Sequence, residues 1–137
     1  MKVLVFYCKE FSYLPAKKNI ENVETITEGA TFNDCILAFI HIEESDEALD
    51  LKSREKKLVN HLKWTSRKNN TQRIILHSFA HLSESKASEN FSRDIFNLAQ
   101  KRLENTDHEV FQTPWGYFLD LAIQAPGYSL ARIWATL

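Results

Sequence analysis

The stretch at residues 35–42 reads CILAFIHI and is apolar at both its odd and its even positions. Successive side chains of a β-strand point to opposite faces of a sheet, so a strand of this composition is buried on both faces. We therefore expect residues 35–42 to form a central strand. A second apolar run, VLVFY at residues 3–7, predicts another buried strand at the start of the chain.

The polar stretch after the predicted central strand contains the first helix signal. Ser45 is a favourable N-cap residue, and the two acidic residues that follow it suit the positive end of a helix dipole. Leu51, Leu58 and Leu62 recur at helical spacing and give this helix one apolar stripe. We expect the helix to continue to about Lys68, after which an Asn-Asn pair ends it.

Ser88 predicts the N-cap of a second helix that ends near residue 105. Its expected core stripe consists of Phe91, Ile95, Leu98 and Ala99. The further predicted strands cover residues 11–17, 23–27, 73–76, 108–112, 116–124 and 130–134. This order of elements favours a single α/β (α+β) domain over residues 1–137, in which a β-sheet carries both helices on one face.

The composition is that of a folded domain with little net charge. It is 44% hydrophobic and 26% charged with a net charge of −1, which argues against a general nucleic-acid binder but leaves room for a local basic strip. No apolar run approaches the roughly 20 residues that a membrane span needs, and no signal peptide precedes the first strand. Cys8 and Cys35 lie outside any metal-type cluster, so we expect reduced cysteines in a cytoplasmic protein.

His81 is the main candidate for chemistry. It follows the predicted strand at residues 73–76 within the stretch FAHLS at residues 79–83, and loops at strand ends expose side chains for binding. Its imidazole titrates near neutrality and is suited to orient a substrate hydroxyl or a water, whereas the structural alternative is a packed or capping residue. Ser78 and Ser83 flank His81, but a Ser–His pair is an unspecific pattern.

A second stretch, TPWGYF at residues 113–118, adds aromatic side chains in a strand-like setting. Together with the stretch around His81 it predicts a small aromatic-walled pocket with one histidine near its mouth. The five histidines are not at zinc-binding spacing, and the sequence has neither a glycine-rich phosphate loop nor a Gly-x-Ser-x-Gly motif. We therefore expect no metal and no cofactor.

Four basic residues of the first predicted helix share one face beside its apolar stripe. They are Lys52, Lys56, Lys63 and Arg67. Such a basic strip is either a solvated helix face or a surface that contacts the phosphates of one specific RNA, in which case binding would depend strongly on salt.

Five stretches occur in an order and at a spacing that are specific in combination, namely residues 1–5, 38–43, 79–83, 114–118 and 127–131. They resemble the N-terminal editing domain of archaeal-type threonyl-tRNA synthetases over nearly the whole chain. The resemblance implies a fold similar to that of D-aminoacyl-tRNA deacylases, a homodimer, and hydrolysis of serine mischarged onto threonine tRNA. The implied partners are the aminoacylated acceptor end of a tRNA and a synthetase, with no role for a membrane.

The resemblance also implies roles for individual residues. Those that would line the aminoacyl pocket, some through backbone groups, are Ile42, Phe79, Ala80, Trp115, Tyr117 and Phe118. His81 would help to discriminate or orient the substrate. Phe118 stands where the family has a pocket tyrosine, so that hydroxyl is absent here.

Two departures from the family pattern concern catalysis. Leu119 stands where the family has a lysine important for hydrolysis, and Arg132 stands where it has an acidic residue. Leucine cannot stabilise a developing oxyanion, and losing such a contact commonly costs about 3 kcal/mol. One hypothesis is that Arg132 presents its guanidinium to the vacated space, since arginine is a poor proton shuttle but stabilises negative charge.

Three functions remain open on these residues. The first is a deacylase that hydrolyses the ester of mischarged aminoacyl-tRNA. The second is a catalytically silent module that binds tRNA ends or a synthetase, and the third is a deacylase of another specificity, such as for D-aminoacyl-tRNA. A hydrolysis assay separates the first from the second, because binding without turnover identifies a silent module.

Overall fold

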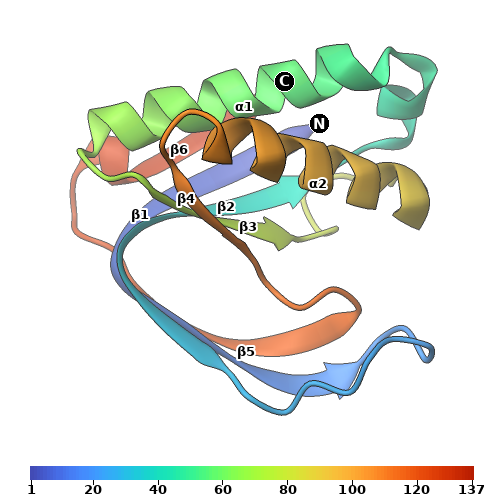
Figure 1. Cartoon of the computed structure of the whole chain (residues 1–137), viewed down its shortest axis with the longest axis horizontal. Coiled ribbons are helices and arrows are strands. Elements are labelled where there is room, and N and C mark those ends of the chain that lie inside the picture. The colour runs from blue at the N-terminus through green and yellow to red at the C-terminus, as the bar shows by residue number, and fades with distance from the viewer.

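A six-stranded mixed sheet runs through the computed structural model, which describes residues 1–137 (Figure 1). Its strands are β1 (Lys2–Lys18), β2 (Ala30–His41), β3 (Arg73–Ser78), β4 (Glu109–Gln112), β5 (Tyr117–Gln124) and β6 (Arg132–Thr136). The strand order is β4-β3-β2-β1-β5, and β6 also pairs with β1. β2, β3 and β4 run parallel, whereas every pair that β1 makes is antiparallel. The central strand predicted around residues 35–42 is thereby confirmed.

Two long strands, β1 and β2, determine the shape of the molecule. The first half of β1 pairs with β6 and its second half pairs with β5. Both long strands bend, so that β5 and the outer part of the sheet curl beneath β3 and β4 (Figure 1). The separate strands predicted at residues 3–7 and 11–17 are therefore one continuous strand of 17 residues.

The strand predicted at residues 23–27 does not form. Residues 19–29 connect β1 to β2 without a strand. Backbone groups in this connection bond to a side chain instead: the Tyr117 hydroxyl donates to the carbonyl of Glu24 at 2.7 Å and accepts from the amide of Ile26 at 2.8 Å. The prediction was wrong because a distant tyrosine, rather than a neighbouring strand, satisfies these groups.

Both α-helices pack on one face of the sheet, as predicted (Figure 1). The helices are η1 (Glu44–Ala48), α1 (Leu51–Lys68), α2 (Glu89–Glu104) and the single turn η2 (Ser129–Ala131). The N-cap predicted at Ser45 is wrong, since Asp50 caps α1 and Ser45 lies in the short 3-10 helix η1. The carboxylate of Asp46 turns inward and pairs with Arg54 at 2.9 Å, so it is not free to support a helix that starts at Ser45.

The start of α2 agrees with the prediction, because the Ser88 hydroxyl accepts a hydrogen bond from the amide of Phe91 at 3.3 Å. The predicted core stripe is wrong at one position. Leu98 is 39% exposed, whereas Phe96 is buried. At about 100° per residue, Leu98 lies about 60° beyond Ile95 on the side away from Phe96, which takes it out of the buried stripe.

The sheet is covered by apolar side chains on both faces. Eighteen buried residues fill the space between the sheet and the helices. The opposite face carries a second cluster of Cys8, Phe11, Cys35, Leu37, Phe39 and Ile75. Both cysteines are free thiols. Neither α1 nor α2 combines the length and the apolar character that crossing a bilayer would require.

Candidate active site

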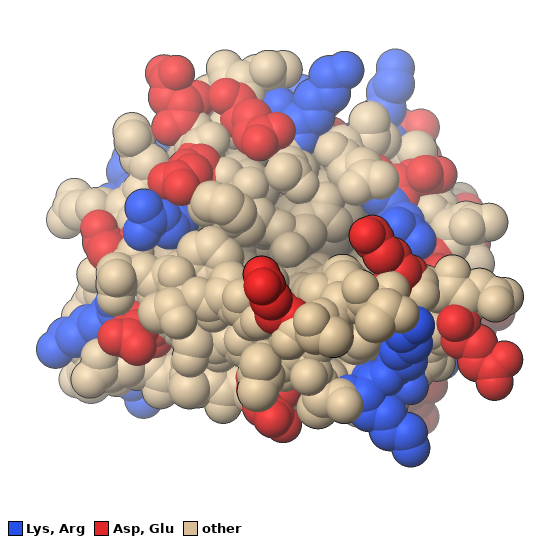
Figure 2. Space-filling view, turned by 60° about the horizontal axis from the view of Figure 1, so that its bottom comes forward, with Lys and Arg blue, Asp and Glu red and all other residues tan.

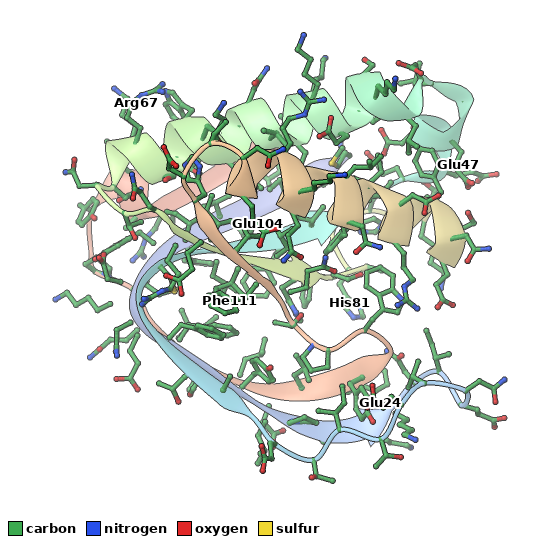
Figure 3. The ribbon with its side chains drawn as sticks, in the orientation of Figure 1. Glu24, Glu47, Arg67, His81, Glu104 and Phe111 are labelled. Atoms are coloured by element: carbon green, nitrogen blue, oxygen red, sulfur yellow. The ribbon has the colours of Figure 1, made fainter.

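A cavity of about 600 Å³ lies where the ends of β2 and β3, the start of α2 and the segment leading into β5 come together. Figure 2 shows a hollow near the middle of this face, uncharged inside, with acidic side chains near its margin. In Figure 3, His81 lies between the upper part of the sheet and the curled strand β5. A second depression, beside β5, holds no histidine, lysine or arginine, so the first cavity is the candidate site.

Six of the residues singled out from the sequence line this cavity. They are Ile42, Ala80, His81, Trp115, Tyr117 and Phe118. Phe79 does not line the cavity, although it was expected there. Its ring packs edge-on against Phe39 and His81, with centroid distances of 4.9 and 4.8 Å, so it supports the wall from behind.

The segment that follows β3 is held in place by a buried histidine. His41 accepts a hydrogen bond from the amide of Leu82 at its Nδ1, at 2.9 Å, and its Nε2 donates to the carbonyl of Ser85 at 2.6 Å. These two bonds require a neutral imidazole that carries its proton on Nε2. The amide of Ala87 also donates to the carbonyl of Ile42 at 2.9 Å. Hydrogen bonds therefore fix the loop at residues 79–87, which forms one wall of the cavity.

Glu43 fixes the same loop from its outer side. Its carboxylate accepts a hydrogen bond from the N-terminal ammonium of Met1 at 2.8 Å and another from the Ser83 hydroxyl at 2.7 Å. These two bonds lower the pKa of Glu43 to about 2, and the bond from the ammonium has the larger effect. Sequence patterns gave no sign of this contact, because its partners are 40 and 42 residues away.

Replacing Glu43 with glutamine is expected to change how stability depends on pH. A carboxylate whose pKa is lower in the folded state stabilises the fold above its unfolded pKa, and this contribution is lost as the pH falls through the folded pKa. For Glu43 the window runs from about 4.5 down to about 2. Urea unfolding should show that the wild type loses on the order of 1–2 kcal/mol more than Glu43→Gln across this window.

The matched control for this measurement is Glu44→Gln, which alters an exposed neighbour whose carboxylate makes no bond in the chain. That variant should follow the wild-type pH dependence. If Glu43→Gln also follows the wild-type pH dependence, these two contacts do not lower the pKa of Glu43.

Two histidines differ in their environment within the cavity. His81 is exposed, and its imidazole makes no hydrogen bond within the chain. His77 is 7% exposed, and its Nδ1 lies 2.8 Å from the hydroxyl of Thr113. Burial lowers the pKa of His77 to about 4, so this imidazole is neutral at pH 7. His77 was not a candidate from the sequence, since its position in a buried strand is that of a core residue.

The whole chain, residues 1–137, matches the model of the archaea-specific editing domain of threonyl-tRNA synthetase. The chain belongs to this family. Among its relatives, a threonine–tRNA ligase of Nitrosopumilus maritimus is 28% identical over 96% of the chain, and one of Staphylothermus marinus is 26% identical over 100%. The chain spans 21% and 22% of the lengths of these two ligases, about a fifth.

The editing domain also shares its fold with a solved structure. The c-Myc DNA unwinding element binding protein superposes with a TM-score of 0.69 over 100% of this chain and 99% of that one, at 14% identity. This likeness and the sheet topology confirm the expected single α/β (α+β) domain, in which a mixed sheet carries two helices on one face.

Arg132 lies outside the cavity of the editing domain. It begins β6 opposite Phe6 of β1, and its guanidinium donates to the carbonyl of Pro126 at 2.7 Å. Leu119 lies in β5 opposite Pro15, nine residues further along β1. This placement gives no support to the hypothesis that Arg132 fills the space of a lysine at position 119.

One lysine does line the cavity, and the sequence gave no reason to single it out. Lys86 lies between Ser85 and Ala87 in the loop that follows β3. The carbonyl of Ser85 is bonded to His41, and the amide of Ala87 is bonded to Ile42, so the backbone on both sides of Lys86 is fixed. No carboxylate lies within 4 Å of the Lys86 ammonium. The editing domain therefore presents an unneutralised cation at its candidate site.

None of the four residues of the predicted basic strip lines the cavity. The four basic residues, Lys52, Lys56, Lys63 and Arg67, all belong to α1, which covers the helical face. Figure 3 shows Arg67 at the end of α1, on the other side of the sheet from His81. No group of three histidine, cysteine or acidic side chains is arranged to hold a metal ion.

Proposed function

We propose that residues 1–137 form one cytoplasmic editing domain that hydrolyses the ester of seryl-tRNA made by mischarging of threonine tRNA. The observation that carries the proposal is the cavity beside His81 in a chain that matches the editing family from end to end. The cavity is lined by small and aromatic side chains, which suit an aminoacyl group attached to a terminal ribose.

Hydrolysis of such an ester needs a water placed beside the carbonyl and a group that stabilises the oxyanion. His81 has both ring nitrogens available to orient the water or a ribose hydroxyl. Lys86 supplies positive charge at the same cavity, which Leu119 cannot do. The ribose hydroxyl of the substrate and backbone amides of the loop complete the proposed set of groups.

The proposal predicts that the domain deacylates seryl-tRNA at least tenfold faster than threonyl-tRNA, because threonine carries one more methyl group that the cavity wall, which includes Ile42 and Ala80, would have to accommodate. The measurement is release of labelled amino acid from both charged tRNAs. Lys86→Ala should slow seryl release, whereas Lys101→Ala on the far end of α2 serves as the matched control.

A specific observation favours the second candidate, a catalytically silent module. Leu119 and Arg132 replace the lysine and the acidic residue that the resemblance associates with hydrolysis. Binding of seryl-tRNA without any release of serine would select that function. Faster release from D-aminoacyl-tRNA than from seryl-tRNA would select a deacylase of the third kind.

We also infer that the domain acts as a homodimer. β5 and β6 each pair only with β1, so both present an unpaired edge. Large apolar side chains are exposed along this side, namely Phe118, Leu121, Ile123, Tyr128, Leu130 and Trp134. An open edge with apolar side chains favours association with a second chain, and a second copy covers it in the proposed dimer.

A further inference from the structure

We propose that His77 reads the side-chain hydroxyl of the aminoacyl group and so determines which amino acid the cavity accepts. The inference rests on the proposed function, because it assigns a specificity-determining residue to the same cavity. His77 is one of the residues that line it.

The imidazole of His77 is held by three neighbours. Its ring packs edge-on against Phe39 at a centroid distance of 5.2 Å and is tilted against Phe79 at 5.9 Å. Its Nδ1 is bonded to the hydroxyl of Thr113. Thr113 is itself fixed, since its amide donates to the carbonyl of Leu76 at 3.1 Å and so ties the end of β4 to β3. The ring therefore has one orientation.

The remaining nitrogen of His77 is free for a ligand. Nε2 of His77 makes no hydrogen bond within the chain, and neighbouring atoms do not enclose it completely. Nε2 is therefore reachable by solvent, and the cavity is the space that His77 lines. Water can bond to this nitrogen while the cavity is open, so a ligand that excludes the water must offer a polar partner in its place.

A hydroxyl is the partner that suits this nitrogen best. A neutral imidazole offers either a donor or an acceptor at Nε2, depending on which way the Thr113 hydroxyl is turned. A hydroxyl both donates and accepts, so it satisfies either arrangement, whereas a methyl group satisfies neither. An aminoacyl group without the hydroxyl would displace the water on Nε2 and leave the nitrogen unpaired.

The test is calorimetric binding of two non-hydrolysable probes, the 3′-amides of 3′-amino-3′-deoxyadenosine with serine and with alanine. The wild type should bind the seryl probe at least tenfold more tightly than the alanyl probe. His77→Phe keeps a ring of similar size but has no polar nitrogen, so the ratio should fall to about one while the alanyl probe still binds.

A second variant covers the case in which His77→Phe loses both probes. Thr113→Val leaves His77 in place but removes the hydroxyl that orients it, and it should reduce the ratio at least threefold. An unchanged ratio in either variant overturns the inference. A wild type that binds both probes equally contradicts the role of His77 but leaves the proposed function intact. A wild type that binds neither probe contradicts the proposed function as well as the role of His77.

Discussion

Replacing His81 with alanine is expected to slow the release of serine from seryl-tRNA about 100-fold, since positioned proton-transfer groups contribute on this order or more. His81 is the one exposed imidazole that lines the cavity, and its nitrogens are not used by the protein. Its removal therefore takes away a group that can act on substrate or water. The measurement is the single-turnover rate with enzyme in excess over seryl-tRNA.

The same substitution should leave the fold unaffected. His81 makes no hydrogen bond in the chain and loses only its edge-on contact with Phe79, so the free energy of unfolding of His81→Ala should agree with that of the wild type within about 1 kcal/mol. His108→Ala is the matched control, because His108 lies beside Thr106 and outside the cavity. A wild-type rate for His81→Ala, from an active wild type, would contradict a role for this residue in hydrolysis.

The elements that could be predicted from the sequence are those whose signal is local. Residues 35–42 are apolar on both faces, and the structure buries both faces of β2 against two separate clusters. Ser88 caps α2 through a contact only three residues away. In each case the residues that produce the structure are neighbours in the chain, so their pattern is visible without knowledge of the fold.

The wrong predictions share a long-range cause. Ser45 has the character of an N-cap, but the neighbouring Asp46 pairs with Arg54 and with the ammonium of Met1, 45 residues away. Residues 23–27 have strand-forming composition, yet their amide and carbonyl groups meet the hydroxyl of Tyr117. Residues do not form the element that their local propensity favours when a partner from another part of the chain bonds to the same backbone or side-chain groups.

The candidate site could be predicted only in part for the same reason. The aromatic and small residues around His81 stand in two short stretches that mark the cavity wall. His77 directly follows three buried residues of β3, so its sequence position gives the same signal as a buried apolar side chain. Lys86 lies in a polar stretch of the sequence, which predicts an ordinary lysine exposed to solvent. Only the folded chain brings these two residues to the same cavity.

Replacing Trp134 with aspartate is expected to abolish the proposed homodimer, because Trp134 lies at the open edge that β5 and β6 form. Trp134 is 52% exposed on β6, beside the unpaired edge. A tryptophan at the centre of an interface commonly contributes 2 kcal/mol or more to association, and a buried unpaired carboxylate adds a desolvation cost. The dissociation constant should therefore rise at least about 30-fold.

Sedimentation velocity over a range of concentrations measures this change directly. The wild type should sediment as a dimer at micromolar concentration, and Trp134→Asp should sediment as a monomer. Trp64→Asp is the matched control, because Trp64 is an exposed tryptophan of α1 on the helical side and the same substitution there should leave the dimer intact. A monomeric wild type at high concentration would show that the apolar edge has another occupant, and a dimeric Trp134→Asp would place the dimer interface elsewhere.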